Sequence, residues 1–201
     1  MIDSFIFDMD GTLVDNIDTL VNAWKQISQK HHWHLEINKE KFKSFMGLNP
    51  HDIGVKLFPN IDENRAAKRV LIATVEEIPY LQEKIGKSYI DKETLEILSK
   101  KYKLFIVSNC MERYIECYLD NYNFNKYFIE TVNASNGRSK GQNIKYIVDK
   151  YNLQHPVYIG DTIMDKRSAD EAKVRFIFAS YGFGNVENVE EINDIKELLN
   201  I

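Results

Sequence analysis

The stretch that decides the fold is residues 2–13, IDSFIFDMDGTL. Its first half, Ile2 to Phe7, is short, apolar and rich in aromatic and β-branched side chains, which predicts a buried strand. Asp8 ends this strand, and Gly11 indicates a tight turn directly after it. Asp8 and Asp10 have the spacing that places both carboxylates on one side of extended backbone. The chain therefore begins with a strand that leads into an acidic turn.

Beyond about Asp91, apolar strands alternate with amphipathic helices. We expect strands at residues 104–107, 127–132, 157–159 and 175–179. We expect helices at residues 91–101, 111–121, 142–151, 166–172 and 189–199. Strands that alternate with helices of about ten residues are typical of βαβ units in a parallel sheet. The fold class is therefore predicted to be α/β, with a parallel sheet flanked by helices.

A helical insert separates the first strand from this alternating part. The apolar spacing predicts a helix at residues 17–33, and residues 38–86 hold further helical patterns without a convincing strand. The composition changes near residues 15–16 and again near 86–91. We therefore expect residues 1–15 and 87–201 to form the core, and residues 16–86 to form the insert.

The composition excludes several classes of partner. The net charge of −4 gives no basic field that would attract nucleic acid, and no apolar run approaches the length of about 20 residues that spans a bilayer. The N-terminus does not resemble a signal peptide. Cys110 and Cys117 are the only cysteines, and reduced thiols fit a cytoplasmic protein. We expect a cytoplasmic protein with no nucleic-acid, membrane or obligate protein partner.

Three of the predicted strands end in small polar clusters. The first cluster is residues 8–12, the second is Ser108-Asn109, and the third is residues 160–162, with Asp165 four positions beyond Asp161. Ligands of open parallel sheets bind beyond the carboxyl ends of the strands, so these clusters are expected to meet in one crevice. An aspartate at a strand-to-helix turn is also a good N-cap. Three clusters at three strand ends favour a shared site over independent caps.

The acidic residues of these clusters indicate a bound cation. Asp8, Asp10 and Asp161 would repel one another, and some would take up protons, unless a cation lay among them. Ligands that are all oxygen atoms suit Mg²⁺, which binds one or two carboxylates together with water and a phosphate oxygen.

These motifs resemble those of a known superfamily. Phe7 to Leu13, FDMDGTL, resembles the first motif of the haloacid dehalogenase-like hydrolases. Ser108-Asn109 resembles the second motif, and Gly160-Asp161 with Asp165 resembles the fourth. The resemblance runs through nearly the whole chain and implies a Rossmann-like core. The insert looks like the small helical cap domain of the phosphoglycolate phosphatase-like members.

The resemblance implies an Mg²⁺-dependent phosphatase that hydrolyses a small-molecule phosphate monoester, such as a small phosphorylated metabolite. Asp8 would attack phosphorus and form an aspartyl-phosphate, and a carboxylate needs no base for this role. Asp10 would give a proton to the leaving oxygen and later take one from water, while its carbonyl binds the metal. Asp161 would bind the metal together with Asp8, and Asp165 would support the site.

The resemblance also implies phosphate-binding groups and a lysine that balances the charge of the reacting groups. Lys140 has the expected position before a helix, although Gly141 replaces the proline of many relatives, and Lys145 is a weaker candidate. The phosphate oxygens would be held by the Ser108 hydroxyl and by groups around Gly11, Thr12 and Asn109.

Several other functions share these motifs. A phosphomutase has the same core residues and differs in the cap, and a pyrophosphatase is a further alternative. A true dehalogenase lacks the acid/base carboxylate that Asp10 provides, and a protein kept only for binding would tend to lose Asp8, Asp10 or Lys140.

Residues 47–50 are expected to face the site from the cap, and residues 181–184 either border the site or form an ordinary turn.

Overall fold

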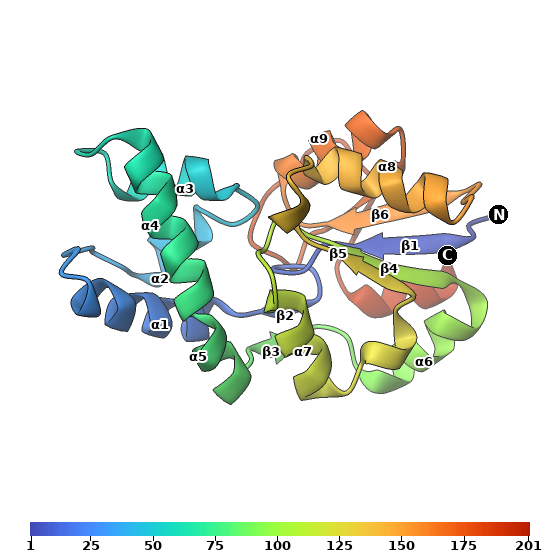
Figure 1. The fold of residues 1–201 in the computed structure, drawn as a ribbon. Helices are drawn as coiled ribbons and strands as arrows, with labels where there is room; N and C mark the ends of the chain where they lie inside the picture. Colours follow the sequence, from blue (N-terminus) through green and yellow to red (C-terminus); the bar gives the residue numbers. More distant parts are fainter.

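A parallel sheet of six strands forms the centre of the molecule (Figure 1). The computed structural model describes all residues from 1 to 201. In spatial order the strands are β5 (Glu130–Val132), β4 (Lys103–Val107), β1 (Ser4–Phe7), β6 (Pro156–Gly160), β7 (Arg175–Ala179) and β8 (Glu191–Ile192). All neighbouring pairs are parallel, which confirms the predicted α/β class.

Helices cover both faces of the sheet because successive strand residues point to opposite sides. Phe5 and Phe7 pack into one apolar core, and Ile6 packs into the other. The core around Ile6 includes residues of α8 (Lys140–Lys150) and α9 (Ile163–Ala172). The opposite core is covered by α6 (Lys92–Lys101), α7 (Tyr114–Tyr122) and the C-terminal segment, and Figure 1 shows the two layers on either side of β1.

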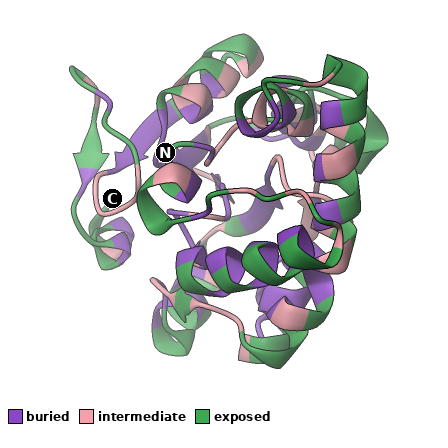
Figure 2. Cartoon of the chain, turned by 90° about the vertical axis from the view of Figure 1, so that its left-hand side faces the viewer, coloured by how far each residue is buried: buried purple, intermediate pink, exposed green.

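A group of five helices lies beyond the carboxyl ends of the strands (Figure 1). They are α1 (Ile17–Lys30), α2 (Lys39–Lys43), α3 (Pro50–Leu57), α4 (Glu63–Glu76) and α5 (Ile78–Glu83). In α1, the spacing of Leu20, Trp24 and Ile27 puts three buried side chains on one face. Figure 2 views this part of the molecule and shows exposed residues on its outer side. The division into a core and a separate cap domain of residues 16–86 stays a prediction.

Two short strands join the helical group to the sheet. β2 (Val14–Asp15) pairs antiparallel with β3 (Lys87–Ser88), which brings the two connections side by side. Two residues are too few to show an alternating pattern, so the sequence did not predict this pair of strands. No helix of the structure is both long and apolar enough to cross a membrane.

The predicted closing helix at residues 189–199 is wrong. Glu191–Ile192 instead form the edge strand β8 beside Phe178 and Ala179, and a 3₁₀ helix follows at Ile195–Asn200. The Asp194 side chain caps this 3₁₀ helix by accepting from the Lys196 N–H at 2.8 Å. The expected strand at residues 127–132 is also shorter, because its first part belongs to a 3₁₀ turn at Asn125–Tyr127.

Candidate active site

The order of the strands brings the polar clusters together. β1 lies between β4 and β6, so Asp8, Ser108 and Asp161 follow three adjacent strands at the same edge of the sheet. The Asp8 N–H donates to the Ile159 carbonyl at 2.8 Å, which continues the ladder one residue past β1. All three side chains are buried.

Lys140 connects two of the acidic residues. Its Nζ lies 2.6 Å from Oδ1 of Asp8 and 2.5 Å from Oδ1 of Asp165. Burial alone would lower the pKa of Lys140, but the carboxylates of Asp165 and Asp8 raise it above its usual range. Lys140 is therefore a permanent positive charge beside Asp8. Lys145, the weaker candidate, is exposed and pairs with Asp149 at 2.8 Å.

Asp165 has no oxygen left for a metal ion. Its Oδ1 accepts from Lys140 and, at 3.3 Å, from the Tyr158 hydroxyl. Its Oδ2 accepts from the Thr162 N–H at 3.0 Å and from the Thr162 hydroxyl at 2.6 Å, which together form the N-terminal cap of α9. Asp165 therefore positions Lys140.

The donor set beside Lys140 fits a divalent cation. Asp8 and Asp161 offer carboxylate oxygens that lie within 4.8 Å of each other. Oδ1 of Asp161 is buried and accepts no hydrogen bond. Burial, followed by the charges of Asp165 and Asp8, raises the pKa of Asp161 well above its ordinary value. A buried carboxylate oxygen with no partner is costly, and a hard cation such as Mg²⁺ would satisfy it.

The loop at residues 181–184 holds Asp161 in place. The Phe183 N–H donates to Oδ2 of Asp161 at 2.7 Å, and the Tyr181 hydroxyl donates to the Thr12 carbonyl at 3.0 Å. A Cβ atom at Gly182 would lie 2.3 Å from Cβ of Asp161, so only glycine allows this close approach. Residues 181–184 therefore border the site, which is the first of the two alternatives that the sequence left open.

Asp10 lies in a polar setting that the sequence motifs did not indicate. Its Oδ1 accepts from the Tyr114 hydroxyl at 2.7 Å and from Nδ2 of Asn16 at 3.3 Å. Burial raises the pKa of Asp10 to about 7, against the opposing effect of the Tyr114 hydrogen bond. A carboxyl group whose pKa lies near neutrality is suited to give and take a proton. Tyr114 and Asn16 follow no motif, and only the fold brings them to Asp10.

The expected phosphate-binding residues have different settings. The N–H groups of Gly11 and Thr12 already donate inside the turn, to Val14 at 2.9 Å and Met9 at 3.3 Å, so they are not free for a phosphate. Ser108 is buried at the edge of the cavity, and its Oγ accepts from the Cys110 N–H at 3.3 Å. Asn109 donates through Nδ2 to the Gly47 carbonyl at 3.0 Å, which ties the core to the helical group.

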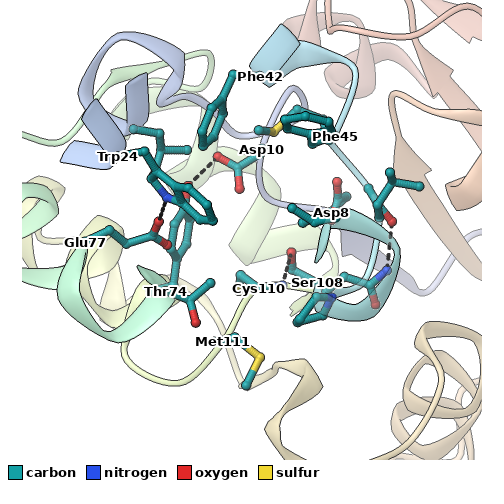
Figure 3. A pocket seen from close by; sticks show the side chains of 18 of the residues that line it. Asp8, Asp10, Trp24, Phe42, Phe45, Thr74, Glu77, Ser108, Cys110 and Met111 are labelled. Atoms are coloured by element: carbon teal, nitrogen blue, oxygen red, sulfur yellow. Dashed lines mark hydrogen bonds between the residues drawn. The ribbon is translucent and has the colours of Figure 1, made fainter. Parts of the chain in front are cut away.

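A cavity opens between these residues and the helical group (Figure 3). Its empty volume is about 730 Å³ when the open mouth is included. Asp8, Asp10, Ser108 and Lys140 line one part of it, and the rest is mostly apolar. Gly47, Leu48 and Pro50 of the expected cap turn also line it, whereas Asn49 is exposed and caps α3 instead.

Residues 5–179 match the model of the haloacid dehalogenase-like hydrolases. The chain belongs to this family. The matched residues include all three polar strand ends and Lys140.

Known haloacid dehalogenase-like proteins resemble this member along its whole length. A phosphoglycolate phosphatase of Aliivibrio fischeri is 24% identical in an alignment that is 203 residues long. The alignment covers 92% of this chain and 87% of the relative. A haloacid dehalogenase-like hydrolase from Streptococcus pneumoniae has a TM-score of 0.83 at 20% identity, covering 99% of this chain and 97% of its own. A predicted phosphoglycolate phosphatase from Haemophilus somnus has a TM-score of 0.82 at 18% identity, with the same coverage. These structures show the shared fold, and the family's phosphatases indicate a phosphoric monoester hydrolase.

Proposed function

We propose that this protein hydrolyses small-molecule phosphate monoesters with Mg²⁺, through an aspartyl-phosphate on Asp8. The observation that carries the proposal is the contact of 2.6 Å between Lys140 and Asp8, at a strand end that lines the cavity below the helical group. The contact keeps the Asp8 carboxylate charged and oriented, and an ionised carboxylate is already a nucleophile. The five helices beyond the sheet would act as a cap that excludes water from the reaction.

The chain's own residues account for both half-reactions. Asp8 attacks phosphorus while Asp10 gives its proton to the leaving oxygen, which departs as an alcohol. A water molecule then attacks the phosphorus of the aspartyl-phosphate, gives a proton to Asp10, and restores Asp8 as inorganic phosphate leaves. Lys140 balances the negative charge that gathers on the phosphoryl oxygens. Ser108 and Asp10 line the cavity beside Asp8, and the Asp10 N–H donates no backbone hydrogen bond, so the Ser108 hydroxyl and this N–H would hold those oxygens.

Asp8, Asp161 and the Asp10 carbonyl would hold Mg²⁺, which when bound neutralises phosphate charge. Replacing Asp161 by Asn is expected to lower Mg²⁺ affinity by about 100-fold or more, because the orphaned buried oxygen loses its charge. Isothermal titration with MgCl₂ measures this, with Asp170→Asn on the exposed side of α9 as the control. Equal affinity in the Asp161 variant and the native protein would contradict the metal assignment.

Tyr114→Phe is expected to move the alkaline limb of the pH profile of kcat/KM to higher pH. The hydroxyl of Tyr114 lowers the pKa of Asp10, so its removal raises that pKa and keeps Asp10 protonated over a wider range. Hydrolysis of an alkyl phosphate, whose poor leaving group needs a proton, measures the limb when the release of inorganic phosphate is followed between pH 5 and pH 9. Tyr146→Phe, whose hydroxyl lies at Glu130 outside the site, serves as the control. A limb that stays in place or moves to lower pH would show that Asp10 is not the general acid.

The proposed function is tested with p-nitrophenyl phosphate in Mg²⁺ and in EDTA. We expect hydrolysis in Mg²⁺ only, and a phosphorylated protein that accumulates in the Asp10→Asn variant, since a good leaving group needs no acid but water still needs a base. A protein that isomerises sugar phosphates without net hydrolysis would instead be a phosphomutase. Absence of both reactions would mean that the site serves binding alone.

A further inference from the structure

Glu77 is a buried carboxyl group in the wall of the cavity, and no step of the proposed reaction uses it. It lies at the junction of α4 and α5, and its residue is 5% exposed. Nε1 of Trp24 donates to Oε2 of Glu77 at 2.5 Å, whereas Oε1 has no hydrogen-bond partner in the protein. Burial raises the pKa of Glu77 to about 8, and Trp24 only partly opposes this. Glu77 is therefore a buried carboxyl group without a cationic partner in the protein, and a bound cation would stabilise its charged form.

Aromatic rings line the cavity from Glu77 toward the reacting groups. Trp24 and Phe42 meet edge to face with ring centres 5.5 Å apart, and Phe42 meets Phe45 in the same way at 6.2 Å. All three line the cavity and are buried. Figure 3 shows Trp24 and Glu77 together on one side of the pocket, with Asp8 and Ser108 on the other. Aromatic faces beside a carboxylate form the environment that binds ammonium groups.

The charges of the cavity favour a cation at this end. Lys140 is the only basic residue in the lining, and it is already bonded to Asp8 and Asp165. The lining carboxylates are Asp8, Asp10 and Glu77. The first two face the phosphoryl group, which leaves Glu77 opposite the organic part of a substrate. A second anionic group on the substrate would find no basic side chain there to pair with.

We propose that the substrate is the phosphate ester of an amino alcohol, whose ammonium group binds between Glu77 and the rings of Trp24 and Phe42. This inference rests on the proposed phosphatase function for the orientation of the ester. The phosphate lies at Asp8, the carbon chain crosses the apolar part of the cavity, and the ammonium neutralises Glu77. Phosphate esters with a carboxylate on the leaving group are poor substrates in this arrangement.

Matched ligands test the inference. Phosphocholine is compared with 3,3-dimethylbutyl phosphate, a neutral compound of the same shape, and phosphoethanolamine is compared with phosphoglycolate, which carries a carboxylate at a similar distance. We expect kcat/KM for each cationic ester to exceed that of its partner by at least about tenfold. Dissociation constants for the same ligands with the Asp8→Asn variant in Mg²⁺, measured by calorimetry, give the preference without turnover.

Glu77→Gln isolates the charge, because the amide oxygen can still accept the Trp24 N–H. In this variant the preference for phosphocholine over the neutral ester is expected to fall to less than about threefold, in both rate and affinity. Glu83→Gln is the matched control, since Glu83 is exposed on α5. The control should keep the full preference.

The outcomes separate the two proposals. A preference for cationic esters that disappears in Glu77→Gln supports the inference. Equal or better use and binding of the neutral ester or of phosphoglycolate overturns it, even where p-nitrophenyl phosphate is hydrolysed in Mg²⁺. If no phosphate ester is hydrolysed but calorimetry shows the Glu77-dependent preference, the proposed phosphatase function fails and the ammonium site stands.

Discussion

The Asp8→Asn variant is expected to lose roughly 10⁴-fold or more of kcat toward any phosphate ester, with its fold intact. An amide cannot attack phosphorus, so no aspartyl-phosphate forms, and the remaining groups only bind and orient the substrate. The fold should tolerate the change. Burial raises the pKa of Asp8 to about 6 although Lys140 lowers it, so the native charge is itself costly to bury. Lys140 keeps Asp165 as its second partner.

Two measurements check this expectation. Initial rates with p-nitrophenyl phosphate in Mg²⁺ give the loss of activity, and circular dichroism with thermal unfolding confirms the fold. Asp149→Asn is the control, because Asp149 is exposed on α8 and pairs only with Lys145. A folded Asp8→Asn protein that keeps more than about a tenth of the activity would exclude Asp8 as the nucleophile.

Lys140→Met is expected to have the largest effect on stability. The side chain of Lys140 is 3% exposed and bonds two carboxylates that are themselves buried. Its removal leaves both carboxylates without their counter-charge, and breaking a buried pair in this way costs about 3–5 kcal/mol. The variant should also lose nearly all turnover, because nothing then balances the charge of the phosphoryl group near Asp8.

Urea unfolding at pH 7 in EDTA measures the free energy of unfolding without any contribution from a bound metal ion. Lys145→Met lies on the same helix, and its exposed ion pair with Asp149 should matter by less than about 0.5 kcal/mol. Similar losses of unfolding free energy in the two variants would refute a structural role for Lys140. A stable but inactive Lys140→Met protein would limit that role to catalysis.

Local sequence patterns predicted most of the core elements. Ser4–Phe7 and Arg175–Ala179 are strands because continuous apolar runs between turn residues suit a buried parallel sheet. The closing segment differs from its predicted helix, because the spacing around Ile192 and Ile195 also allows an edge strand followed by a 3₁₀ turn. Pairing with β7 decided between the two, and such a contact is invisible in a short window of sequence.

By itself, the sequence determined the family, the parallel α/β core and the acidic strand ends, because these depend on local patterns and motif spacing. Only the tertiary structure brought Tyr114 to Asp10 and Trp24 to Glu77, whose partners lie 104 and 53 residues apart in the chain. Only the tertiary structure also left Oδ1 of Asp161 without a hydrogen-bond partner and placed Glu77 in a lining that has no basic side chain beside it. Burial and charge balance arise where distant segments pack together, and no local pattern encodes them.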